Sequence, residues 1–106
     1  MRIIARRTLQ DFVAHHRGQD QLVLKAALDA WFAEVKRAHW ANSAAVKKSY
    51  ATASIISANR IVFNIKGNDY RLVVAVDYAK SIVWIEWVRS HGDYDEIDVE
   101  EVQFGR

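Results

Sequence analysis

Six side chains in the second half of the sequence are of types that could act together on a phosphate. They are Asn64, Lys66, Arg71, Arg89, His91 and Tyr94. Residues two apart in a strand lie on one face, so Asn64 and Lys66 form one pair and Arg89 and His91 another. Arg71 begins the next predicted strand, where we expect it to lie beside the first pair. The predicted site thus gathers three cations, an amide and an imidazole, with a phenol close in sequence.

Such groups suit the cleavage of RNA by its own 2′-hydroxyl. That reaction needs a base for the hydroxyl proton, an acid for the leaving oxygen and fixed cations for the pentacoordinate phosphorane, and it needs no metal. Histidine changes charge near neutral pH, so His91 is the first candidate to move a proton. Arg71 could bind two phosphate oxygens, and Lys66 could act as a compact charge. We expect neighbouring cations to lower the pKa of the Tyr94 phenol.

Other polar and aromatic residues favour structural interpretations. The adjacent pair His15 and His16 lacks the i, i+4 spacing of a helical metal site. The acidic residues after Gly92 are more typical of a solvated tail than of a magnesium site. Trp84 and Trp87 have opposite strand parity, so one of them could reach a free sheet face and stack on a base, although packing is the favoured interpretation.

The elements that position these groups follow from hydrophobic periodicity. Residues 2–5 are apolar and β-branched and predict a strand. Thr8 and Asp11 have the spacing of a capping box, which predicts a first helix ending at Gly18. A second helix is expected from Asp20 to about residue 37, because apolar residues recur there every three or four positions. Asn42 or Ser43 could cap a short third helix.

From residue 54 the period changes to two. Strands are predicted over residues 61–65, 70–76 and 82–88, with turns at 66–69 and 77–81. The residues after Gly92 have no assigned structure. The expected fold class is α+β, with an N-terminal strand and two to three helices packed on one face of a small antiparallel sheet. The other face would be free to bind a ligand.

Composition limits the class of protein. The chain has 106 residues, of which 51% are hydrophobic and 26% charged, and this predicts a single folded domain over residues 1–106. The lack of cysteine excludes disulfide scaffolds, cysteine zinc sites and a thiol nucleophile. No apolar run approaches the roughly 20 residues of a membrane span, so we expect a cytoplasmic protein without membrane contact.

The formal net charge of +2 conceals an asymmetry. Residues 1–92 have a net charge of +7, and residues 93–106 have −5. A positive body of this kind suits a polyanionic partner. The last ten or so residues are expected to form an acidic tail.

Two motifs in fixed order give a family resemblance. The hairpin reads Phe-Asn-Ile-x-Gly-Asn-x-Tyr-Arg-Leu, and the end of the chain reads His-x-x-Tyr-Asp-x-Ile-Asp. With residues 2–9 and 30–38 they resemble the HigB family of bacterial toxins over nearly the whole chain. The resemblance implies a RelE-like fold and a type II toxin–antitoxin toxin, an mRNA interferase acting on the ribosome. It also implies a HigA-type helix-turn-helix antitoxin as partner. The site it implies comprises Asn64, Lys66, Asn68, Arg71, His91, Tyr94 and Asp95.

These observations together predict a metal-independent endoribonuclease with no cofactor. In this hypothesis Lys66 and Arg71 stabilise the transition state, and His91 or Tyr94 moves the proton. The residues expected to hold RNA are Arg60, Asn64, Asn68 and Arg89, and the role of Asp95 stays open. Two alternatives remain: a non-catalytic module that binds RNA or the ribosome and blocks translation, and a degenerate toxin that only binds its antitoxin.

Overall fold

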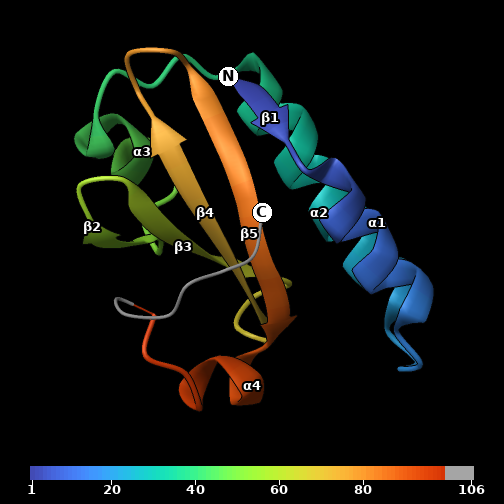
Figure 1. The fold of residues 1–106 in the computed structure, drawn as a ribbon. Coiled ribbons are helices and arrows are strands. Elements are labelled where there is room, and N and C mark those ends of the chain that lie inside the picture. Colours follow the sequence, from blue (N-terminus) through green and yellow to red (C-terminus); the bar gives the residue numbers. More distant parts are fainter. Residues whose placement is uncertain (100–106) are drawn as a thin grey trace.

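A mixed five-stranded sheet forms the centre of the protein in a computed structural model that describes residues 1–99 (Figure 1). The strands are β1 (Arg2–Ile4), β2 (Ser54–Ser57), β3 (Arg60–Ile65), β4 (Tyr70–Asp77) and β5 (Ile82–Ser90), in the order β1-β5-β4-β3-β2. Strands β2 to β5 form an antiparallel meander, whereas β1 pairs with β5 in parallel. The α+β class and the antiparallel meander are confirmed, and the parallel pairing of β1 makes the sheet mixed, which was not predicted.

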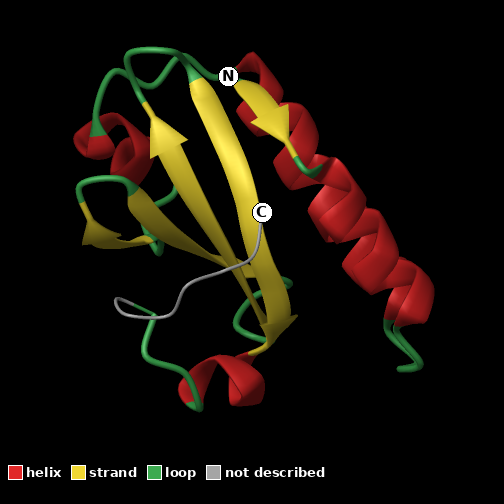
Figure 2. Cartoon of the chain, viewed as in Figure 1, coloured by secondary structure: helices red, strands yellow, loops and turns green. Residues whose placement is uncertain are grey.

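Three helices, α1 (Arg6–His15), α2 (Gln21–Arg37) and α3 (Ser43–Ser49), pack on one face of the sheet (Figure 2). A fourth, α4 (His91–Asp95), follows β5 directly, in a segment for which no element was predicted. Helix α1 begins before Thr8, because Ala5 adopts a left-handed φ of 72° that turns the chain out of β1. The predicted capping box of Thr8 and Asp11 is therefore wrong. Asn42 does cap α3, since its side chain accepts a hydrogen bond from the Ala45 amide at 3.0 Å.

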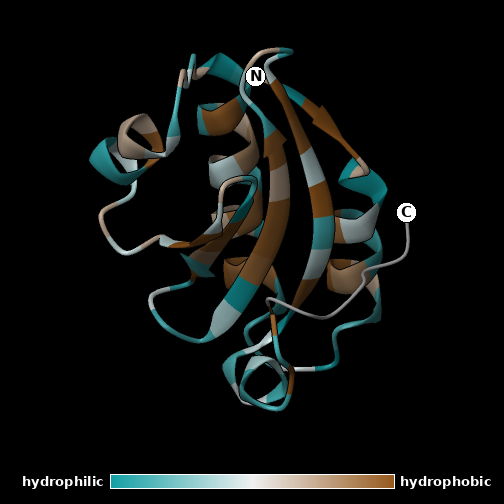
Figure 3. Cartoon of the chain, turned by 60° about the vertical axis from the view of Figure 1, so that its left-hand side comes forward, coloured by the Kyte–Doolittle hydropathy of each residue, from teal (hydrophilic) through white to brown (hydrophobic). Residues whose placement is uncertain are grey.

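The core lies between these three helices and the sheet face that we call the helix face. The apolar stripe of α2 is buried as predicted, with Leu24, Leu28, Trp31 and Val35 at most 2% exposed. The Trp31 ring meets the ring of Phe63 from β3 edge-on at 5.4 Å. Hydrophobic residues run along the central strands and the helices beside them (Figure 3). This burial holds the sheet rigid enough to position polar groups on its other side.

The other face, which we call the site face, is less open than predicted. Val62 and Val73 lie on it and are 2% and 0% exposed. The chain after α4 returns to this face, where Arg60 donates a hydrogen bond to the Val99 carbonyl at 2.8 Å. Most of the predicted acidic tail, residues 100–106, lies outside the described residues. The expectation of a wholly free platform is therefore wrong.

A bulge in β5 changes which aromatic residues share the site face. Val73 pairs with Trp87 and Val74 with Ile85, so one residue of β5 is skipped between them. Trp84 pairs with Ala75, two residues beyond Val73 in β4. Both tryptophans therefore lie on the site face, and the expectation of opposite faces is wrong because a bulge breaks the alternation. Within residues 1–99, no helix is both long and apolar enough to span a membrane.

Candidate active site

A row of three polar residues crosses the site face near the end of the central strands. Asn64 of β3 pairs with Arg71 of β4, and Arg71 pairs with Arg89 of β5. Residues directly opposite one another on antiparallel strands have side chains close enough to interact. The structure thus confirms the expectation that Arg71 lies beside Asn64, and it adds Arg89 as the third member of the row.

The guanidinium of Arg71 is held in place by the turn before its strand. Its Nη2 donates to the Asn68 side-chain oxygen at 2.8 Å, and its Nη1 donates to the Asn68 and Tyr70 carbonyls at 3.0 and 3.3 Å. Arg71 is only 8% exposed. All three acceptors are neutral, so the positive charge is fixed in position without being neutralised. Asn68, predicted to hold RNA, accepts two of the hydrogen bonds that position this cation.

The site continues into α4, whose start is fixed by a side-chain cap. The Ser90 hydroxyl accepts a hydrogen bond from the Asp93 amide at 3.2 Å. The helical turn places Asp95 beside His91, with 3.1 Å between Nε2 and the carboxylate. His91 Nδ1 is buried and has no hydrogen-bond partner among residues 1–99. The His91 amide also donates to the Asp69 carbonyl at 2.8 Å, which ties α4 to the turn that holds Arg71.

Tyr94 connects α4 to the row on the sheet. Its ring centroid lies 6.3 Å from that of Trp87 and 5.9 Å from the Arg71 guanidinium carbon. Burial raises the pKa of the Tyr94 phenol and outweighs the lowering effect of Arg71. The expectation of a lowered pKa is therefore wrong, since burial disfavours the charged phenolate. A neutral phenol is a proton donor, not a base.

Lys66 does not lie with Asn64 as predicted. Its positive φ of 53° breaks the strand alternation at the end of β3. Its ammonium group lies 2.7 Å from a carboxylate oxygen of Asp69 and 3.5 Å from one of Asp20, on the side of the helices. The hydrogen bond to Asp69 raises the pKa of the lysine. The charge of Lys66 is therefore balanced by two carboxylates, and the shared face predicted for it is wrong.

A second polar network on the helix face was not predicted. Asp20 accepts a hydrogen bond from the Tyr70 hydroxyl at 2.6 Å, and His16 Nε2 lies 2.6 Å from its other carboxylate oxygen. These contacts, with Tyr70 first, hold the pKa of the Asp20 carboxyl well below its usual range. Burial and the Asp20 charge raise the pKa of Tyr70 to about 12. Asp20 was expected only as a helix cap, a role in which its side chain makes no hydrogen bond.

The remaining predicted residues lie at different distances from the row. Arg89 is exposed, and its Nη1 donates only to the Val88 carbonyl, at 2.7 Å. Arg60 lies on the same face but four residues before Asn64, which is about 13 Å along an extended strand. The structure therefore brings Asn64, Arg71, Arg89 and Tyr94 together and leaves Arg60 and Lys66 apart.

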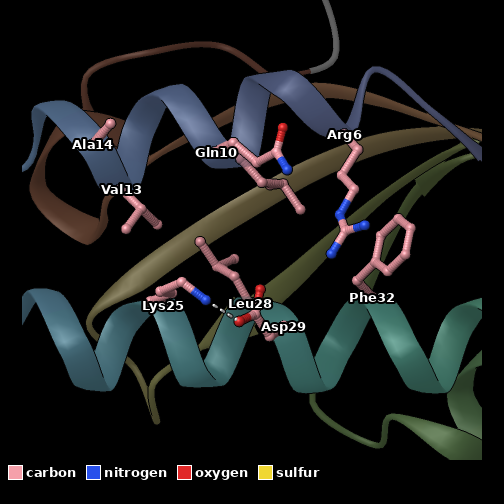
Figure 4. Close-up of a pocket in the computed structure, with 9 residues that line it drawn as sticks. Arg6, Gln10, Val13, Ala14, Lys25, Leu28, Asp29 and Phe32 are labelled. Carbon is pink, nitrogen blue, oxygen red and sulfur yellow. Dashed lines mark hydrogen bonds and ion pairs between the residues drawn. The ribbon is translucent and has the colours of Figure 1, made fainter.

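A separate cavity of about 300 Å³ lies between α1 and α2, on the helix side of the sheet (Figure 4). Leu9, Val13 and Leu28 line it, and the Arg6 guanidinium lies 3.9 Å above the Phe32 ring. At its rim Lys25 donates to Asp29 at 2.6 Å. The sheet separates this cavity from the row of Arg71. Within residues 1–99, no three His, Asp or Glu residues are grouped closely enough to hold a metal ion.

The sequence was compared with known families and proteins. The family model HigB_toxin, described as the RelE-like toxic component of a toxin-antitoxin system, matches residues 24–97. The matched range is about seven tenths of the chain, and it includes the row on the site face and α4. Helix α1 lies before it. No curated protein matches the chain.

Proposed function

Since the chain belongs to the HigB family, the RelE-like toxins of toxin–antitoxin systems, we propose that it is an endoribonuclease that cleaves messenger RNA on the translating ribosome. The observation that supports this most is the pairing of Arg71 with Arg89 beside the neutral phenol of Tyr94. Two cations next to a proton donor are what a phosphodiester needs as negative charge develops in the transition state. Membership of the family implies an antitoxin partner.

In the proposed reaction the 2′-hydroxyl oxygen attacks the adjacent phosphorus, and the bond to the 5′-oxygen of the next nucleotide breaks. His91 takes the hydroxyl proton on Nε2, because its Nδ1 is buried, and the Asp95 carboxylate 3.1 Å from Nε2 stabilises the imidazolium that forms. Tyr94 donates its proton to the leaving oxygen, in agreement with the raised pKa of its phenol. The charges of Arg71 and Arg89 stabilise the phosphorane. The products are a 2′,3′-cyclic phosphate and a 5′-hydroxyl end.

The reaction is tested on translating ribosomes with the purified protein. The cut is first mapped by sequencing message ends, and the end groups are identified. A message with one 2′-deoxynucleotide immediately 5′ of the cut should then stay intact, because the nucleophile is missing. The control message has the same substitution one nucleotide further 5′, and it should be cut. Cleavage of the first message, or a 5′-phosphate end, would show that another nucleophile acts.

The roles of the two proton-moving residues are tested by substitution. His91→Ala and Tyr94→Phe should each lower the cleavage rate about 10²- to 10⁴-fold, the usual contribution of a general acid or base. His39→Ala, at an exposed position before α3, is the matched control and should cleave normally. If Tyr94→Phe cleaves at the normal rate, the phenol is not the acid.

A second candidate function follows from the small exposure of Arg71. A guanidinium with so little exposed surface offers a phosphate little room to bind. The protein could then occupy the ribosome without cutting the message. Translation would then stop while message ends remain intact, so the same mapping experiment separates the two.

The proposed partner is an antitoxin of the HigA type, a helix-turn-helix protein. Both would work in the cytoplasm, where translating ribosomes are found. Coexpression of a helix-turn-helix protein encoded next to this chain should restore growth and copurify with it. Growth arrest that persists in the presence of the coexpressed neighbour would contradict this partner.

A further inference from the structure

A second cavity, of about 680 Å³, opens between α1 and the C-terminal part of β5. Strand β1 covers only Ile82 to Trp84 of β5, so the rest of that strand faces α1 without a pairing strand among the described residues. Phe12, His15 and Arg17 from α1 and the residues after it line one wall, and Arg89 lines the other. Arg89 is therefore shared between this cavity and the row on the site face.

The cavity has positive charge that the described part of the chain does not neutralise. Arg17 is exposed and makes no ion pair or side-chain hydrogen bond within residues 1–99. Arg89 donates only to the carbonyl of its own neighbour, Val88. The one carboxylate that lines the cavity, that of Asp11, lies 4.0 Å from Arg7 Nε. An anion in the cavity would therefore meet two available guanidinium groups.

A series of neighbouring rings and guanidinium groups runs from this cavity to the candidate active site. The Arg89 guanidinium carbon is 5.7 Å from the Phe12 ring and 6.0 Å from the Trp87 ring. Trp87 is followed by Tyr94 at 6.3 Å, and Tyr94 by the Arg71 guanidinium at 5.9 Å. Aromatic stacking surfaces combined with phosphate-binding cations are the usual means of binding a single-stranded nucleic acid.

We propose that the cavity between α1 and β5 is a subsite for the single-stranded RNA next to the cut. This inference rests on the proposed function and names where its substrate continues beyond the reacting phosphate. Arg17 and Arg89 bind backbone phosphates, and Phe12 offers an aromatic surface to a base. The volume is in the range of cavities that hold a small organic ligand, so one or two nucleotides fit. Arg17 lies outside the range matched by the family model.

The test compares Arg17→Glu with Arg37→Glu, which makes the same change of charge at an exposed position at the end of α2. Binding is measured with a fluorescent single-stranded RNA that is 2′-O-methylated throughout and so cannot be cleaved. Arg17→Glu should weaken binding about tenfold or more, the usual effect of losing one charge-assisted hydrogen bond. It should also lower the slope of log Kd against log salt by about 0.7. Arg37→Glu should bind within about twofold of wild type. Thermal unfolding followed by circular dichroism checks that both variants fold.

A second measurement locates the strand directly. A message with 4-thiouridine one or two nucleotides from the mapped cut is irradiated on ribosomes with the wild-type protein. The crosslinked peptide should contain residues 8–17. Crosslinks confined to other segments would overturn the proposal, as would wild-type affinity in Arg17→Glu.

The two proposals fail in different ways. If wild type leaves messages intact but Arg17→Glu loses affinity for the methylated RNA, the nuclease proposal fails and the RNA subsite stands. If wild type and Arg17→Glu cleave and bind equally well, the subsite fails and the nuclease proposal stands. A variant that binds RNA normally but no longer binds its antitoxin would show that the cavity is a protein interface, which also overturns the subsite.

Discussion

Two cations of the hairpin have immediate partners of different charge. Arg71 is held by neutral carbonyl and amide oxygens, whereas Lys66 lies against the carboxylates of Asp69 and Asp20. A cation with neutral partners keeps its field for a substrate, and a cation between two carboxylates does not. Residue type and spacing predicted both as phosphate ligands. The difference depends on Asp20, far away in sequence, so it could not be predicted from the hairpin alone.

The first prediction concerns Asn68 as the positioning residue for Arg71. Asn68→Ala removes the side-chain acceptor at 2.8 Å but leaves the backbone carbonyl that also binds Arg71. We expect kcat for message cleavage to fall about tenfold with KM nearly unchanged, because the charge stays but its orientation loosens. Single-turnover cleavage on ribosomes measures this effect.

Two further variants separate orientation from charge. Arg71→Ala removes the cation itself and should lower kcat about 10²- to 10³-fold, as expected for the loss of an electrostatic stabiliser. Asn68→Asp keeps an acceptor oxygen but adds a carboxylate that would neutralise Arg71, so its kcat should fall below that of Asn68→Ala. If Asn68→Ala mainly raises KM, Asn68 binds RNA directly, as first predicted from the sequence.

Among the helices and strands, the long apolar patterns were sufficient to predict an element, whereas the short capping motifs were not. The stripe of α2 and the hairpin at 66–69 were predicted correctly because burial and turn chemistry agree there. Ser90 and Asp93 have the spacing of a capping box, which could have predicted α4, but the same spacing at Thr8 and Asp11 does not start α1. In α1 the pairing of β1 with β5 decides where the chain turns, and that contact joins residues 80 positions apart.

The second prediction concerns the contact that joins the α1–α2 connection to β4. Tyr70→Phe removes the hydroxyl that donates to Asp20 at 2.6 Å. We expect the free energy of unfolding at pH 7 to fall by about 2 kcal/mol, the usual value for a hydrogen bond to a charged group. Urea unfolding followed by tryptophan fluorescence measures the change. Asp29→Asn, in an exposed ion pair with Lys25, should change stability by about 0.5 kcal/mol at most.

The same network predicts how the free energy of unfolding depends on pH in the acidic range. The pKa of Asp20 is lower in the folded protein than in the unfolded chain, where an aspartate titrates near about 3.9. The unfolded state therefore binds more protons below that pH, and stability falls as the pH drops through the folded value. Tyr70→Phe removes the largest cause of the lowered pKa, so its deficit relative to wild type should shrink as the pH falls below about 3.9, through the folded-state pKa of the variant and then that of wild type. A deficit of constant size would mean that Tyr70 acts by packing alone.

For the whole molecule, the charge asymmetry was visible in the sequence but its geometry was not. The boundary between the positive body and the acidic segment falls between Arg89 and Asp93, and the candidate site spans it. The structure adds that the chain after α4 returns to Arg60 on the site face. The site is thus assembled from a sheet row, a turn and a short helix that meet at one end of the fold. This arrangement could not be predicted from any local sequence pattern, because it depends on the order of the strands in the sheet.

The last prediction follows from the number of cations that this geometry leaves for RNA. Arg71, Arg89 and Arg17 make three, and each phosphate contact with a single strand contributes about 0.7 to the dependence of log Kd on log salt. The expected slope is about 2, so Kd for the methylated RNA should rise about twentyfold from 50 to 200 mM NaCl. A slope near about 3.5 would show that Arg60 and Lys66 also reach the strand, as the sequence predicted, which would require Lys66 to exchange its carboxylate partners for phosphate. A slope near zero would mean that stacking on Trp87 and Tyr94 dominates, and the positive body would then act only in long-range attraction to the ribosome.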